Sequence, residues 1–287
     1  MISRLSSGNV FRLPVLPELL TGIEREAELR QINLMVATTA DEKLPRILQD
    51  NQCDGLLFLG IDATRATGQA IAGHLEHNPG VWLMRDTNDL DLPCDRVFYD
   101  NAAVGDLAAR YLSGRGHRSV AMIDPRPDHS AHAERRRSFV ETCRRQGVEC
   151  VVCESVAEDC GSGRVTPEQT IRVVDQFLSL PQRPTGVFVP RDQLTQAVAS
   201  RLEAQGVRVG YDLDIVSCDN NADILEPIAL RPPSIALHLD EVGANGLRRL
   251  VDRIQNPKAP QQHIYVQPSL EVPDGWPRWR DGHVATT

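Results

Sequence analysis

The sequence contains no long hydrophobic run. A helix that crosses a membrane needs about 20 consecutive apolar residues, and no stretch of this chain approaches that length. The opening segment, MISRLSSGNVFRLPVLPELL, also has no apolar core of the kind found in a secretion signal. We therefore expect a protein without a membrane partner, located in the cytoplasm.

A surplus of positive charge is missing as well. The chain has 31 Lys and Arg residues against 39 Asp and Glu residues, so its formal net charge is -8. A broad surface for nucleic-acid phosphates normally requires a positive balance. If this protein acts on DNA, we expect a different segment to make the contact.

Cysteine is sparse and follows no disulfide framework. Seven cysteines, an odd number, fit a reducing compartment. Cys150 and Cys153, with Cys143 and Cys160 nearby, are the only arrangement that suggests zinc. A structural zinc site uses four well-placed ligands, usually two such pairs, and the stretch from Val148 reads better as a strand with buried thiols. We expect neither a metal nor a cofactor.

Motifs of catalysis are also absent from the sequence. There is no nucleophile elbow and no metal-ligand spacing. The segment Gly161-Ser-Gly163 does not lead from a strand into a helix as a phosphate-binding loop does. His117 follows glycines that end a predicted helix, where a histidine can satisfy terminal carbonyls. The sequence therefore does not favour an enzyme.

Predicted apolar strands and amphipathic helices alternate regularly along the chain. Its length of 287 residues is more than one hydrophobic core usually supports, so we expect two lobes. The fold class that this predicts is α/β, with two doubly wound, mainly parallel sheets. Strands are expected at 32–37, 53–60, 81–84, 119–123, 149–153, 186–189, 213–217, 234–238 and 262–272. Helices are expected at 14–29, 42–50, 69–77, 131–146, 166–178 and 240–255, together with one that Asp100 and Asn101 cap and that ends at Gly114–Gly116, and one that begins at Gln193.

Polar residues follow two of these strands, within the segment 184–221. Arg191 and Asp192 come after the strand at 186–189, and Asp219 with Asn220 after the strand at 213–217. Parallel strands end at one edge of their sheet, where open α/β sheets bind ligands. The alternative is that Asp192 only caps a helix and that Asp219 and Asn220 only form a turn.

Two sequence blocks carry a family resemblance. The segment PTGVFVPRDQLTQAVASRLEAQGVRVGYDLDIVSCDN and the block from Asp100, DNAAVGDLAARYLSGRGHRSVAMI, resemble the effector-binding core of the LacI/GalR transcription regulators. The resemblance extends from about Asn9 to Val272. It implies a periplasmic-binding-protein-like fold, in which two lobes joined by three crossings enclose a ligand.

The resemblance also implies the lobe boundaries and the binding residues. The first lobe is expected at residues 1–123 with 238–258, and the second at 124–237 with 259–287, the first crossing lying at Pro125–His129. The effector-binding residues that the matching motifs imply are Asn9, Phe11, Asp100, Arg135, Asp192 and Asp219, and we add Arg191, which lies next to Asp192. For Asp100 and Phe11 the alternatives are a helix cap and simple packing, and for Arg135 a solvated basic helix face.

The chain departs from the family pattern at several positions. Val10 replaces a usual Pro, Ser138 a usual Gly, and Arg191 a small polar residue. We hypothesise that Arg191, with Arg135 and Arg126, favours an acidic effector, a sugar acid or sugar phosphate rather than a neutral sugar. The tail that carries Trp276 and Trp279 also departs from the family, and we expect it to have few packing anchors.

The function that the resemblance implies is effector sensing in a LacI-type regulator. A small sugar or sugar-derived ligand would control DNA binding, and a homodimer is expected because repressors read paired half-sites. The alternative is a sugar-binding protein of a transport system, which uses the same fold. The family's helix-turn-helix is not found in these residues, so DNA contact is expected only through a domain absent from this chain.

This expectation yields a direct test. The 287-residue polypeptide alone should not retard duplex DNA in a gel-shift experiment at physiological salt, because its net charge is negative and it contains no recognisable reading helix. A tight, sequence-specific shift would contradict it.

Overall fold

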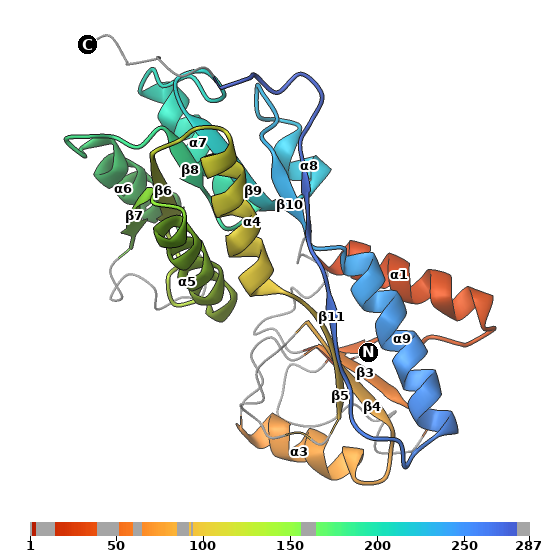
Figure 1. Ribbon diagram of the computed structural model, residues 1–287. Coiled ribbons are helices and arrows are strands. Elements are labelled where there is room, and N and C mark those ends of the chain that lie inside the picture. The colour runs from red at the N-terminus through yellow and green to blue at the C-terminus, as the bar shows by residue number, and fades with distance from the viewer. Residues whose placement is uncertain are drawn as a thin grey trace. The chain divides into compact units, whose positions relative to one another are not determined.

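The computed structural model describes residues 2–3, 15–38, 52–59, 65–84, 92, 94–155 and 165–279. These residues form two compact units (Figure 1). The predicted helix at 42–50 and the segment Gly161–Gly163 lie outside the described residues. No helix in the described ranges is long and apolar enough to cross a membrane.

The first unit runs to Tyr99 and also includes His238–Gln267, and the second comprises Asp100–Leu237 and the chain from Pro268 onward. The chain therefore passes between the units three times, as predicted, but two of the predicted boundaries are wrong. Residues 100–123 belong to the second unit, because β6 (Ser119–Asp124) is a central strand of its sheet. Residues 259–267 belong to the first unit, because β11 (His263–Val266) pairs with β5 (Asp95–Tyr99).

The second unit is built on a six-stranded sheet with the order β12-β10-β9-β8-β6-β7. Its pairs are parallel except for the edge pair β10 and β12. The remaining strands are β7 (Glu149–Glu154), β8 (Gly186–Phe188), β9 (Asp214–Asp219), β10 (Ser234–Ala236) and β12 (Ser269–Glu271). After β6 the chain goes to β7 on one side and then returns to β8 on the other. The strand order thus reverses between β6 and β8.

Helices cover both faces of this sheet. They are α4 (Asn101–Gly114), α5 (Ser130–Arg145), α6 (Pro167–Leu178), α7 (Asp192–Ala204) and the short α8 (Ala222–Leu225). Successive strand residues point to opposite faces. Val187 therefore packs in the core with residues of α6 and α7, whereas the Phe188 ring packs against that of Phe139 on α5, with a centroid distance of 5.2 Å.

The first unit has a parallel sheet with the order β11-β5-β4-β3-β1-β2. Its other elements are β1 (Ile2–Ser3), α1 (Leu16–Leu29), β2 (Ala37–Thr38), β3 (Leu56–Leu59), α3 (Arg65–Leu75), β4 (Gly80–Leu83) and α9 (Leu239–Gln255). α1 and α9 pack together, and Gly243 is needed there because a Cβ atom would lie 2.2 Å from the carbonyl oxygen of Leu19.

Two predicted strands differ from the structure. The strand expected at 32–37 begins only at Ala37, and Leu34, Met35 and Val36 are exposed rather than buried in a sheet. The strand expected at 262–272 is two strands in two sheets, because the chain crosses between the units after Gln267. An apolar alternation does not reveal where the pairing partner changes.

The tail is anchored, contrary to expectation, by the fully buried Asp214. Trp276 is 8% exposed and its Nε1 donates to Asp214 Oδ1 at 3.0 Å. The same carboxylate accepts from Arg115, and its Oδ2 lies 2.9 Å from His117 Nε2. The prediction that His117 satisfies helix carbonyls is wrong for its ring, which bonds Asp214 and lies 2.8 Å from Thr185 Oγ1, although its backbone amide does donate to Leu112.

Helices α4 and α5 approach closely at Gly105. A Cβ atom there would lie 2.2 Å from the carbonyl oxygen of Arg135 and 2.7 Å from the amide nitrogen of Phe139. Both are backbone atoms, so α5 would have to shift. Nearby, Ser138 is accommodated in place of the family's glycine because its hydroxyl donates to the carbonyl of Ala102 at 2.6 Å.

We expect Gly105→Ala to destabilise the protein by about 1–3 kcal/mol, the usual cost of overpacking. Gly114→Ala is the matched control, since it lies on the same helix with nothing within 4 Å of its Cβ position, and should be neutral or stabilising by up to about 1 kcal/mol. Urea unfolding of both variants measures the difference. Equal stability of the two alanine variants would refute the close approach.

Candidate functional site

The candidate site lies at the carboxyl ends of β6, β8 and β9. The strand order reverses between β6 and β8, and ligands of open α/β sheets bind outside such a reversal point. The connections after β6 and β8 supply Arg126 and Arg191, and the last residue of β9 is Asp219. These three residues all belong to the second unit.

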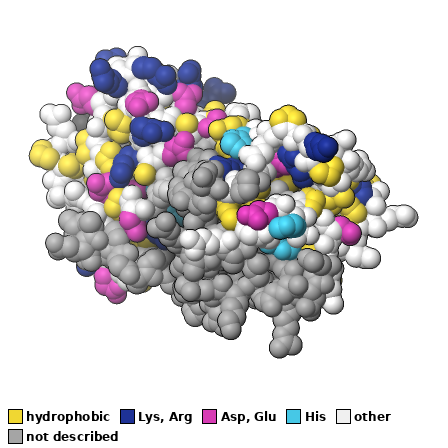
Figure 2. Space-filling view, turned by 90° about the horizontal axis from the view of Figure 1, so that it is seen from below, with side chains coloured by type: hydrophobic (Ala, Val, Ile, Leu, Met, Phe, Trp, Pro, Cys, Tyr) yellow, Lys and Arg dark blue, Asp and Glu magenta, His cyan; other side chains and the backbone are white. Residues whose placement is uncertain are grey.

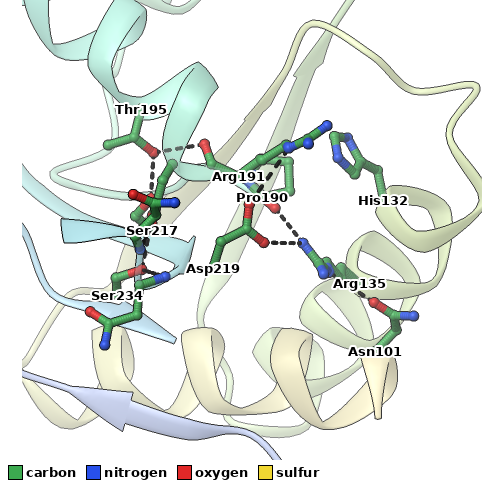
Figure 3. Close-up of polar contacts among 12 residues, drawn as sticks. Asn101, His132, Arg135, Pro190, Arg191, Thr195, Ser217, Asp219 and Ser234 are labelled. Atoms are coloured by element: carbon green, nitrogen blue, oxygen red, sulfur yellow. Dashed lines mark hydrogen bonds and ion pairs between the residues drawn. The ribbon is translucent and has the colours of Figure 1, made fainter. Parts of the chain in front are cut away.

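Asp219 lies at the centre of this site and has two arginine neighbours (Figure 3). Its carboxylate lies 3.9 Å from Arg135 Nη1 and 3.5 Å from Arg191 Nε, and its side chain is 10% exposed. Burial raises the pKa of Asp219, and Arg191, Arg135 and His132 oppose this rise. A buried carboxylate beside two guanidinium groups can accept hydrogen bonds from ligand hydroxyls while its charge is balanced.

The backbone at Asp219 is strained. Its φ is 106° and that of Asn220 is 54°, values that non-glycine residues rarely adopt. The turn is held by the amide of Asn220, which donates to Ser234 Oγ at 3.0 Å, and by Arg231, which donates to Asn220 Oδ1 at 3.1 Å. Strain of this kind persists where the surroundings fix it and is common at binding sites.

Arg135 is held rigidly by two other elements. It is 2% exposed; its Nε donates to Asn101 Oδ1 at 2.9 Å and its Nη1 to the carbonyl of Pro190 at 2.5 Å. The alternative of a solvated helix face therefore does not apply to Arg135, although it does apply to the exposed Arg137. Asn101 was missed by sequence reasoning, although it directly follows the predicted Asp100.

Asp192 is completely buried and serves as a junction between α7 and β9. Its Oδ1 accepts from Ser217 and from Ser234 at 2.9 Å, and its Oδ2 accepts from the amide of Asn221 at 2.6 Å. Burial, and then the charge of Asp219, raise the pKa of Asp192 to about 7. Helix α7 begins at Asp192 itself, so the capping alternative is wrong, and the side chain holds the turn that presents Asp219.

The other predicted binding residues lie elsewhere or outside the described chain. Asp100 caps α4 by accepting from the amide of Ala103 at 2.9 Å, which matches the alternative interpretation. Asn9 and Phe11 lie outside the described residues. Of the predicted set, the structure thus brings together Arg135, Arg191, Asp192 and Asp219.

Two histidines and an aspartate complete the site and were not predicted. Asp124, at the end of β6, is fully buried, and its Oδ1 lies 2.9 Å from His132 Nδ1. The His129 ring lies 4.8 Å from that of His132. Burial lowers the pKa of His129 to about 2, helped by the charges of His132, Arg126, Arg191 and Arg135. The sequence feature that could have predicted this part of the site is Asp124, a carboxylate at the end of a buried parallel strand.

The described residues contain no group of three or more His, Cys, Asp or Glu side chains placed to hold a metal. Cys150 and Cys153 lie on β7, as the strand interpretation predicted, and Cys153 is buried. The contacts at the site are ion pairs and hydrogen bonds: the Asp219 carboxylate lies beside two guanidinium groups, and Arg135 donates to Asn101 and to the carbonyl of Pro190.

Comparisons with known proteins agree with this architecture. A family model described as periplasmic binding protein-like domain matches residues 109–272. The HTH-type transcriptional repressor PurR of Vibrio vulnificus is 24% identical over 231 residues, 80% of this chain and 66% of the relative. PurR of Escherichia coli is 32% identical over 174 residues, 60% of this chain and 49% of the relative. The chain thus spans less than two thirds of the length of these relatives.

Solved structures share the fold. The transcriptional regulator CelR–cellobiose complex has a TM-score of 0.76 at 21% identity, covering 94% of this chain and 82% of that one. A LacI family regulator from Enterococcus faecium with bound ribose has a TM-score of 0.74 at 20% identity, covering 97% and 99%. Since the family model covers more than half of the chain, this chain belongs to the periplasmic binding protein-like domain family, in agreement with the LacI/GalR resemblance of its two sequence blocks.

Proposed function

We propose that this chain is the effector-sensing domain of a LacI-type transcriptional regulator and binds a small sugar or sugar-derived molecule. The observation that carries the proposal is the buried Asp219, which lies between Arg135 and Arg191 at the reversal point of the second sheet. The predicted effector contacts Asn9, Phe11 and Asp100 remain part of the proposal.

The chemistry of Asp219, Arg135 and Arg191 suits a molecule with several hydroxyl groups. A carboxylate can accept from two neighbouring hydroxyls, and a planar guanidinium donates in a fixed geometry. Hydrogen bonds to charged groups contribute about 1.5–3 kcal/mol each. The bound ribose and cellobiose of two similar regulators support this class of ligand.

Regulation follows from differential binding. An effector shifts the balance between two states only if it binds one of them more tightly. We propose that the protein acts as a homodimer and that DNA is contacted by a segment other than these 287 residues. In support, basic side chains lie among acidic ones on the face drawn in Figure 2, as far as its residues are described, and the net charge is -8.

The alternative, a sugar-binding protein of a transport system, is less well supported. Such a protein works outside the reducing compartment, whereas the six cysteines among the described residues are free. The named relatives are transcriptional repressors. We therefore place the protein in the cytoplasm and regard it as a sensor and not an enzyme.

Asp219→Asn tests the binding site. A thermal-shift screen of neutral monosaccharides and disaccharides, with ribose and cellobiose included, identifies a ligand, and calorimetry then measures its affinity for each variant. We expect a loss of about tenfold or more, because one charged acceptor becomes a neutral amide. Asp175→Asn is the control: its side chain is 45% exposed and pairs with Arg201, so affinity should stay unchanged. An affinity within twofold of wild type in Asp219→Asn would place the ligand elsewhere.

The raised pKa of Asp192 should make the stability of the protein depend on pH. Its pKa is raised from 3.8 to about 7 in the folded protein, so between these values the unfolded chain ionises while the folded chain keeps its proton. The stabilising contribution is full below about pH 4 and is lost as pH rises towards 7, with a slope of at most about 1.4 kcal/mol per pH unit.

Denaturant unfolding at pH 5, 6, 7 and 8 measures this slope. We expect the free energy of unfolding of the wild type to fall more steeply with pH than that of Asp192→Asn, which cannot ionise. Asp175→Asn should follow the wild type. Identical slopes in all three proteins would show that Asp192 does not keep a proton in the folded state.

A further inference from the structure

One corner of the site, between the β6–α5 connection and the start of α7, has a surplus of hydrogen-bond donors. Arg126 and His129 lie on this connection, and Arg191 approaches from the N-cap of α7. The amide of His129 donates to the carbonyl of Arg126 at 3.3 Å, and the His129 ring lies 4.8 Å from that of His132. The charges of Arg126 and Arg191 also contribute to lowering the pKa of His129. In Figure 3 the Arg191 guanidinium extends from Asp219 towards the His132 ring.

Two buried nitrogen atoms in this corner have no hydrogen-bond partner among the described residues: Arg126 Nε and His129 Nδ1. The Asp128 carboxylate lies 4.0 Å from Arg126 Nε, which is too long for a hydrogen bond, and the Asp128 side chain is 45% exposed. Arg126 Nε is a donor, whereas Nδ1 of the neutral His129 donates in one tautomer and accepts in the other. A buried guanidinium donor without an acceptor is costly, so Arg126 Nε favours an acceptor in this corner.

The beginning of α5 adds backbone donors. This 16-residue helix has His129 at its N-cap, and no side chain caps it. The amides of a first helical turn have no partner within the helix, and the helix dipole favours negative charge there. The uncapped end of α5 therefore favours a negatively charged group, as the neighbouring arginine side chains do.

Two carboxylates, Asp124 and Asp219, lie near this corner against the three arginines Arg126, Arg135 and Arg191. Asp124 Oδ1 accepts from the amide of Arg126 and lies 2.9 Å from His132 Nδ1, while its buried Oδ2 has no hydrogen-bond partner among the described residues. Asp219 lies between two arginines. Arg135 already donates to Asn101 and Pro190, so it is less suited than Arg126 and Arg191 to a further ligand group. His129 stays neutral at physiological pH, since its pKa is about 2, and acts as a hydrogen-bonding group without charge.

We propose that Arg126, His129, Arg191 and the N-terminus of α5 form an oxyanion subsite, so that the effector carries a carboxylate or phosphate besides the hydroxyls bound at Asp219. The proposal rests on the proposed effector-binding function and specifies its ligand class. His129 and the N-terminus of α5 join Arg126 and Arg191 in this subsite, whereas Arg135 positions Asp219. Arg191 contacts both parts of the ligand.

Inorganic sulfate probes the subsite without a sugar, since its charge does not change near neutral pH. Calorimetric titration of the whole chain with sulfate, against chloride at equal ionic strength, should show millimolar or tighter binding that weakens about tenfold in Arg126→Gln. Arg137→Gln, which changes an arginine with a 68% exposed side chain on α5, should bind as the wild type does. No sulfate binding, or equal binding in all three proteins, would overturn the subsite.

Matched sugar pairs then test the ligand class. Glucose is compared with gluconate and glucose 6-phosphate, and ribose with ribose 5-phosphate, which separates carboxylates from phosphates. We expect an acidic member to bind at least about tenfold more tightly than its neutral partner, and this ratio to fall in Arg126→Gln but not in Arg137→Gln. A neutral sugar that binds equally or more tightly, or a ratio unchanged in Arg126→Gln, would overturn the proposal.

The two failures are distinguishable. Sulfate binding without binding of any sugar would contradict the effector-sensing function and leave the anion subsite standing. Neutral sugar binding that is lost in Asp219→Asn, without sulfate binding, would support the function and overturn the subsite.

Discussion

The burial of the Asp219 charge is the constraint on which the site depends. A carboxylate that is 10% exposed needs compensation, and Arg135 and Arg191 supply it. Arg135 is itself buried and needs Asn101 and the Pro190 carbonyl to fix its position. One charge thus ties together α4, α5 and the turn between β8 and α7. The close approach of α4 and α5, which Gly105 permits, brings Arg135 and Asn101 within hydrogen-bonding distance.

Much of the second unit follows from the sequence because its strands are apolar, parallel and buried. The rule that parallel strands end at one edge of a sheet is sufficient to place Arg191 and Asp219 together from the sequence alone. The family motif supplied Arg135, which periodicity alone assigns to a basic helix face. The inward orientation of Arg135 depends on acceptors from α4 and the Pro190 turn, and no local pattern encodes those.

Other features were not predictable because they depend on contacts between distant segments. The sequence around Trp276 predicts a tail with few contacts, because nothing in it indicates the hydrogen bond that Trp276 donates to the distant Asp214. The first crossing was predicted at Pro125–His129 because of its prolines, but it lies at Tyr99–Asp100, where no turn residue other than the helix cap marks it. The prolines instead shape the connection that carries Arg126 and His129.

The position of that connection explains how a shared fold can acquire its own ligand preference. The strand ends and the Asp192 network fix Asp219 and Arg135, and a change there disturbs several elements at once. Arg126 and His129 lie on a loop between β6 and α5, where substitutions cost less stability. Arg191 lies at the border of both regions, because its Nε faces Asp219 while its remaining nitrogens extend towards His132. Under the proposed function, an arginine at this position in place of the family's small polar residue adds donors for an acidic ligand group and leaves the Asp192 network in place.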